Sequence, residues 1–292
     1  MKKINLIGKS LLKWFVSLNL SSILILLFFA GIIILKNPNL TEVKIENQAI
    51  NQLITILSTL CGFYIFNKSM NEKIEIKKEK LNIKNIVIYS LILISIGNIG
   101  EYFVKFLNLL LNKVGYDFNI AAYNNVFAAN NIIDYLMILI SVVIVAPIVE
   151  ELMYRFILNN SLKEYGKLSS LIVSSFLFGI VHCQFYQIMP AMAAGIILSL
   201  IYFKTNDIRY SIIVHMLNNL TATLLMFFNI NNHIVNISLI ILGLAFLFFK
   251  NDLLSVPMKN NGFKYNWLLK SFPLVIFLII CIIITFGQLT KI

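Results

Sequence analysis

Residues 142–156 read VVIVAPIVEELMYRF, so two adjacent carboxylates and an arginine end a run that is otherwise nearly all apolar. The run begins at Ile132, and its length is typical of a membrane-spanning helix. Charged side chains inside a span are costly unless they are paired or face a wet cavity. Glu151 and Arg155 are four residues apart and can pair on one helix face, whereas Glu150 points about 100° away. We therefore expect Glu151 to be neutralised by Arg155 and Glu150 to remain free for chemistry.

The composition of the whole chain is that of a membrane protein. Of its 292 residues, 59% are hydrophobic and only 13% are charged, with many long apolar runs, which excludes an ordinary soluble domain. The net charge of +11 follows from the loops around the spans, so it does not indicate a nucleic-acid partner. Cys61, Cys183 and Cys281 each lie in an apolar run, and we expect small buried hydrophobic side chains rather than a disulfide framework.

The apolar runs predict an all-α fold, a polytopic transmembrane helical bundle of about eight or nine spans in the lipid bilayer. The expected spans are residues 14–35, 48–66, 86–104, 131–158, 168–184, 188–203, 208–228, 233–249 and 271–288. We divide the chain into an N-terminal region, 1–130, with spans 1 to 3, a core, 131–228, with spans 4 to 7, and a C-terminal region, 229–292, with spans 8 and 9. The basic segment 67–85 predicts either an amphipathic surface helix or a solvated linker.

The distribution of positive charge orients this bundle. If the N-terminus is cytoplasmic and nine spans alternate, 19 of the 24 Lys and Arg residues fall on the cytoplasmic side. This bias agrees with the excess of positive charge that cytoplasmic loops carry. We therefore expect a multi-pass protein of a cell membrane, bacterial by its composition, with a cytoplasmic N-terminus. The sequence leaves the oligomeric state open.

Rare polar residues recur in the spans that follow Glu150. Phe178 and His182 are four residues apart on one helix face, and so are His215 and Asn219. Glu150 lies 14 residues before the turn near residue 164 and His182 lies 18 after it, or roughly 20–27 Å along antiparallel helices. His215 is only a few residues into its span. We expect a cytoplasm-facing cavity in which these groups meet.

Three other positions carry structural expectations. Pro147, just before the carboxylates, is expected to kink its helix or to free a backbone carbonyl. Glu101 and Lys105 are four residues apart near the end of span 3 and are expected to form an ion pair. Asp134 lies in the first turn of span 4, where a carboxylate suits the helix dipole, with a proton-relay role as the alternative.

The order Glu-Glu-x-x-x-Arg, Phe-x-x-x-His and His-x-x-x-Asn resembles the CAAX protease and bacteriocin-processing (CPBP, or Abi) family of intramembrane proteases. The resemblance covers about residues 131–228 and implies a four-helix catalytic core. It includes a Gly-containing span before a Lys-Thr turn at 195–205, whereas Phe156 stands where the family often has Gly.

The resemblance implies a role for each motif residue. Glu150 would activate a water molecule, and His182 would orient that water. His215 and Asn219 would stabilise the tetrahedral oxyanion. The same resemblance implies that Glu151 and Arg155 hold the site in place and that Phe178 packs it.

Two alternatives remain open. Glu150, His182 and His215 could instead bind zinc, whose bound water would be the nucleophile, although the sequence has no His-Glu-x-x-His pair. We favour a mechanism without a cofactor. The expected partner is a membrane-associated peptide or protein substrate, as in bacteriocin or signal-peptide processing or self-immunity. A non-catalytic immunity or transport protein could carry the same intramembrane residues.

Overall fold

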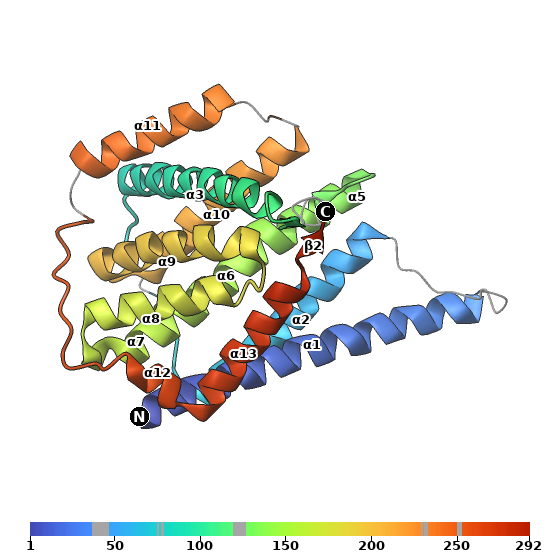
Figure 1. Ribbon diagram of the computed structural model, residues 1–292, viewed down its shortest axis with the longest axis horizontal. Helices are drawn as coiled ribbons and strands as arrows, with labels where there is room; N and C mark the ends of the chain where they lie inside the picture. The colour runs from blue at the N-terminus through green and yellow to red at the C-terminus, as the bar shows by residue number, and fades with distance from the viewer. Residues whose placement is uncertain are drawn as a thin grey trace.

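The computed structural model describes residues 1–36, 47–74, 76, 79–118, 127–228, 230, 233–249 and 253–292. Within these ranges the chain is a bundle of helices with one short antiparallel pairing between β1 (Tyr116–Asp117) and β2 (Thr290–Lys291) (Figure 1). The prediction of an all-α polytopic bundle is confirmed. The division into three regions stays a prediction.

Each of the nine predicted spans coincides with an apolar helix. Spans 1 to 3 are α1 (Lys2–Lys36), α2 (Gln48–Met70) and α3 (Ile83–Asn112). Spans 5 to 9 are α8 (Lys167–Ile180), α9 (Phe185–Thr205), α10 (Ile208–Phe227), α11 (His233–Phe249) and α13 (Phe272–Gly287), with the short α12 (Asn266–Lys270) before the last. Among the described residues, six helices are long and apolar enough to cross a membrane, and α8, α11 and α13 are shorter.

Span 4 is continuous but not uniform. It runs through α5 (Ile132–Ile138), the π-helical η2 (Leu139–Val145), α6 (Ala146–Glu151), the π-helical η3 (Leu152–Leu158), α7 (Asn159–Leu162) and the 3₁₀ turn η4 (Lys163–Tyr165). π-helical turns inside α-helices occur frequently at functional sites. Here they flank α6, which carries Glu150 and Glu151.

Two details differ from the prediction, and a third corresponds to one of two predicted alternatives. The basic start of the chain is part of α1, because Ile4, Ile7 and Leu11 form a buried stripe at helical spacing. The described residues between Met70 and Ile83 form turns and irregular backbone, which corresponds to the linker alternative rather than a surface helix. Cys61 is exposed, whereas Cys183 and Cys281 are buried as expected.

One end of the bundle holds the N-terminus and most of the basic residues. The described Lys and Arg residues there are Lys2, Lys3, Lys9, Lys13, Lys68, Lys73, Lys80, Lys84, Lys163, Lys167, Lys204, Arg209, Lys259, Lys264 and Lys270. We call this the basic end. Lys3 pairs with Glu164 at 2.9 Å, which fastens the start of α1 to η4.

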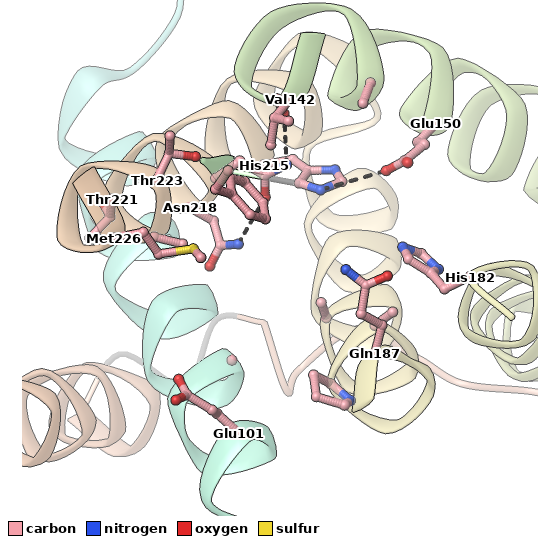
Figure 2. Close-up of a pocket in the computed structure, with 18 of the residues that line it drawn as sticks. Glu101, Val142, Glu150, His182, Gln187, His215, Asn218, Thr221, Thr223 and Met226 are labelled. Atoms are coloured by element: carbon pink, nitrogen blue, oxygen red, sulfur yellow. Dashed lines mark hydrogen bonds and ion pairs between the residues drawn. The ribbon is translucent and has the colours of Figure 1, made fainter. Parts of the chain in front are cut away.

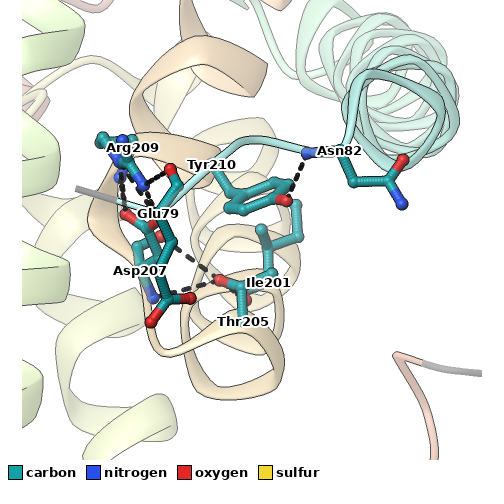
Figure 3. Close-up of polar contacts among 7 residues, drawn as sticks. All are labelled: Glu79, Asn82, Ile201, Thr205, Asp207, Arg209 and Tyr210. Carbon is teal, nitrogen blue, oxygen red and sulfur yellow. Dashed lines mark hydrogen bonds and ion pairs between the residues drawn. The ribbon is translucent and has the colours of Figure 1, made fainter. Parts of the chain in front are cut away.

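The linker between α2 and α3 is docked on the turn between α9 and α10 at the basic end. Arg209 donates to the carbonyl oxygen of Glu79 at 2.6 Å and pairs with Asp207 at 2.7 Å (Figure 3). The backbone N–H of Asn82 donates to the Tyr210 hydroxyl at 2.7 Å. These contacts place two basic segments on the same side of the bundle.

The opposite end, which we call the distal end, is formed by the starts of α2, α5, α9 and α11 and the ends of α3, α10 and α13. The β1–β2 pairing ties the C-terminus to the segment after α3 there. Asp134, which is 2% exposed, accepts the N–H of Ala49 at 3.0 Å and the N–H of Asn130 at 3.0 Å. Its carboxylate thus joins α5 to the first turn of α2, which is a structural role.

Candidate active site

A cavity of about 470 Å³ lies among α2, α3, span 4, α8, α9 and α10 (Figure 2). Glu150, His182, His215 and Asn219 all line it, and so does Phe178. Span 4, the end of α8 with the turn after it, and α10 therefore bring together the residues that the sequence proposed as catalytic. Glu151 and Arg155 lie behind the wall and are fully buried.

The two adjacent glutamates have different environments, as their helical spacing predicts. The Glu150 side chain is 28% exposed, and its Oε2 lies 3.7 Å from Nε2 of His215. The Glu151 side chain is 0% exposed, and its Oε1 lies 3.1 Å from an Arg155 terminal nitrogen. The expected Glu151–Arg155 pair is therefore present, and Glu150 faces the cavity.

His215 connects both glutamates, which the sequence did not reveal. Its Nδ1 lies 2.9 Å from Oε1 of Glu151, while its Nε2 faces Glu150. A carboxylate only accepts hydrogen bonds, so Nδ1 carries the proton in this contact. The neutral ring then presents a lone pair at Nε2, and the protonated ring presents a second N–H there. The spacing of residues in α10 gives no signal for this partner on another helix.

The Arg155 guanidinium is held mainly by two groups. Its Cζ lies 4.2 Å from the centre of the Phe178 ring, in addition to the contact with Glu151. Such a cation–π contact is strongest where water is excluded. Among the described residues, none of the three guanidinium nitrogens has a hydrogen-bond partner, so the contact with Glu151 is an ion pair only. Phe178 also packs edge-on against the rings of His182 and His215, so it has the packing position that was expected.

His182 lies in the turn just after α8, and its ring is held by a backbone contact. Its Nδ1 lies 2.8 Å from the carbonyl oxygen of Phe178, so Nδ1 is the donor and the neutral ring has its acceptor at Nε2. His182 and Glu150 are both described, and no hydrogen bond joins them directly. Both side chains point into the cavity in Figure 2, with space between them.

The side chain of Asn219 supplies a hydrogen bond that the backbone of span 4 lacks because of Pro147. The N–H of Ala146 bonds to Ser141 rather than to Val142, and Pro147 has no N–H to offer. The carbonyl of Val142 is therefore left without a helical donor, and Nδ2 of Asn219 donates to it at 3.0 Å. The expectation that Pro147 frees a carbonyl is confirmed. An amide NH₂ has two donors, so one N–H of Asn219 remains for another acceptor.

The predicted zinc ligands do not form a compact set. Within the described part of the chain, no three His, Cys, Asp or Glu side chains are close enough to hold a metal ion together. Glu150 and His215 face one another, while His182 stands apart across the cavity. Nδ1 of His215 is already engaged by Glu151, so Nε2 is the nitrogen that could bind a metal.

Comparison with protein families decides the identity of this region. Residues 132–221 match the family model described as Type II CAAX prenyl endopeptidase Rce1-like. This segment belongs to the Rce1-like family. The Rce1-like segment runs from the start of α5 into α10 and includes all seven residues of the predicted site. The resemblance seen in the motifs is confirmed, and at the family level the segment is that of a CAAX-type intramembrane endopeptidase, a hydrolase.

The Rce1-like segment covers about a third of the chain, so α1 to α3 and α11 to α13 lie outside it. In the same comparisons no curated protein and no solved structure matched the chain. Helices outside the segment still contribute to the cavity, because Gln52 of α2 and Asn98 and Glu101 of α3 line it. Their motifs were not recognisable in the sequence, and only the packing of the helices reveals them.

The cavity lies toward the distal end of the bundle. Among its lining residues, Gln52 is in the second turn of α2, Gln187 is in the first turn of α9 and Met226 is in the last turn of α10. The N-terminus lies at the other end. A cytoplasmic N-terminus and a cytoplasm-facing cavity, which we expected together, are therefore incompatible.

Proposed function

We propose that this protein is an intramembrane endopeptidase that hydrolyses a peptide bond of a membrane-associated protein or peptide. One observation carries the proposal: Glu150 is partly exposed to the cavity of the Rce1-like segment and lies 3.7 Å from Nε2 of His215, whereas the adjacent Glu151 is fully buried. A carboxylate placed in this way can act as a general base toward water.

In the proposed mechanism Glu150 transfers one proton from water to the leaving nitrogen. Glu150 accepts a proton from a water molecule while the water oxygen bonds to the carbonyl carbon of the substrate. Nε2 of His182 accepts the other O–H of that water, because Nδ1 is committed to Phe178. The proton on Glu150 then passes to the leaving nitrogen as the C–N bond breaks.

The negative charge on the carbonyl oxygen needs donors in the cavity. Asn219 offers its second Nδ2 hydrogen, since the first is held by Val142. His215 can donate from Nε2 only as the imidazolium, because its Nδ1 proton is directed at Glu151. Donors fixed before the reaction stabilise a developing oxyanion strongly in a site that excludes water. Glu151 and Arg155 act by holding His215 and Phe178 in place.

Amide side chains on the wall suit a peptide substrate. Nδ2 of Asn98 and Oε1 of Gln184 are buried polar atoms of cavity-lining residues, and neither has a hydrogen-bond partner among the described residues. One is a donor and the other an acceptor, as are the N–H and C=O of a peptide backbone. We propose that they bind the main chain of the substrate.

Replacing Asn98 by Leu is expected to raise KM roughly 3- to 10-fold with kcat little changed, because one hydrogen bond contributes about 0.5–1.5 kcal/mol. Initial rates on a cleaved peptide would measure this. Asn5→Leu is the matched control, since Oδ1 of Asn5 is also buried without a partner but lies in α1, away from the cavity. An equal rise of KM in both variants would contradict a direct role for Asn98.

The proposal is tested in cells by comparing membrane and secreted proteins of a wild-type strain with a Glu150→Gln strain. We expect one or a few uncut precursors to accumulate only in the variant strain, which quantitative proteomics would detect. The identity of that precursor would then show which process the protein serves: maturation of a bacteriocin, maturation of a signal peptide, or self-immunity. Unchanged precursors together with intact biological activity in Glu150→Gln and His182→Ala would favour a binding protein instead.

Metal dependence has a separate test. We expect purified protein to keep its activity after treatment with a chelator and to contain much less than one zinc ion per chain, because Glu150 itself acts as the base. Elemental analysis and activity on the same samples would decide. Stoichiometric zinc that is lost together with activity, and restores it when added back, would replace this mechanism by the zinc mechanism.

A further inference from the structure

The two ends of the bundle differ in their number of Lys and Arg side chains. Fifteen described Lys and Arg side chains lie at the basic end, while Lys105, Lys113 and Lys291 lie toward the distal end and Arg155 is buried between them. Contacts confirm that the basic segments share one end, since Lys3 reaches Glu164 and Arg209 reaches Glu79. The positive-inside bias places such an end in the cytoplasm.

The cavity lies toward the distal end, away from these basic side chains. Its lining residues include none of the residues from 56 to 93, from 151 to 177 or from 195 to 214, which are the parts of the helices that lead to the basic end. The Glu151–Arg155 pair and the ring of Phe178 lie at the inner limit of the site and are buried. The lining therefore extends toward the distal end, to Gln187 and Met226, which Figure 2 shows at the cavity.

We infer that the active site opens to the extracytoplasmic side of the membrane. The substrate is then a peptide segment that reaches the site from outside the cytoplasm, such as an exported peptide or the outer end of a membrane-anchored chain. A cytoplasmic C-terminal segment of a lipid-anchored protein would be on the wrong side. This statement about the substrate rests on the proposed peptidase function, whereas the direction of the opening does not.

Cysteine labelling in intact cells tests the direction. In a Cys61→Ser background, Gln187→Cys and Met226→Cys place a thiol at the cavity, and Lys264→Cys places one on an exposed residue of the basic end. The remaining cysteines, Cys183 and Cys281, are buried, and the Cys61→Ser parent measures their background. A membrane-impermeant maleimide is added before or after permeabilisation, at equal expression of each variant.

We expect the cavity variants to be labelled in intact cells and Lys264→Cys only after permeabilisation. The inference is overturned if both cavity variants are labelled only after permeabilisation, or are not labelled at all, or if Lys264→Cys is labelled from outside. The outcome does not depend on cleavage. A correct orientation with no uncut precursor in the Glu150→Gln strain would therefore reject the peptidase proposal alone.

Discussion

Replacing Glu150 by Gln is expected to lower kcat for peptide hydrolysis about 10²- to 10⁴-fold, the usual contribution of a positioned general base. Gln keeps the shape of the side chain but cannot take a proton from water. KM should change little, because the carboxylate acts on water and not on the bound peptide. Initial rates of purified wild-type and variant protein at several substrate concentrations measure both constants.

The matched control is Glu101→Gln. Glu101 lines the same cavity, but its carboxylate is paired with Lys105 at 2.6 Å and lies on α3, outside the Rce1-like segment. Loss of a cavity carboxylate as such should therefore affect both variants, and loss of the base should affect only Glu150→Gln. Equal kcat values for the two variants would remove Glu150 from the mechanism.

Replacing Arg155 by Met is expected to destabilise the protein by about 3–5 kcal/mol, because removal of one partner leaves a buried charge uncompensated. Oε1 of Glu151 would keep only the Nδ1 contact of His215, and Oε2 already has no partner among the described residues. The face of the Phe178 ring would also lose its cation. Thermal unfolding in detergent should show a clearly lowered midpoint.

Lys105→Met provides the comparison for Arg155→Met. The Glu101–Lys105 pair has the same spacing of four residues, but its side chains are 34% and 37% exposed. Pairs open to solvent contribute about 0–1 kcal/mol, so this variant should unfold close to the wild-type midpoint. Similar midpoints for both variants would show that the buried pair does not stabilise the site.

The residues of the site could be predicted because their motifs depend on local helical spacing. The separation of Glu150 from Glu151 and the pairing of Glu151 with Arg155 follow from helical spacing, whereas the packing role of Phe178 was implied by the family resemblance. The contact between Asn219 and Val142 depends on the π-helical hydrogen bonds before Pro147, which no residue pattern announces. The amides of Asn98 and Gln184 could not be recognised because their partners at the cavity come from distant helices.

The expectation of a cytoplasmic N-terminus together with a cytoplasm-facing cavity failed for a physical reason. The counts from the turn near residue 164 already place Glu150 and His182 more than 20 Å from the basic end, at roughly 1.5 Å per residue. His215, seven residues into α10, suggested a shallower site. Its contacts with both glutamates show that it lies level with the two carboxylates, although few residues separate it from the start of α10. A helix start cannot be placed in depth from its sequence alone.

The central claim is that this cavity hydrolyses a peptide bond with Glu150 as the base. The most direct measurement is mass spectrometry of a precursor, found by accumulation in the Glu150→Gln strain, after incubation with purified protein in H₂¹⁸O. We predict two fragments from wild-type protein, with ¹⁸O in the new carboxyl group of the N-terminal fragment, and an intact precursor from folded Glu150→Gln protein. Cleavage at the wild-type rate by Glu150→Gln, or no cleavage by folded wild-type protein, would contradict the claim.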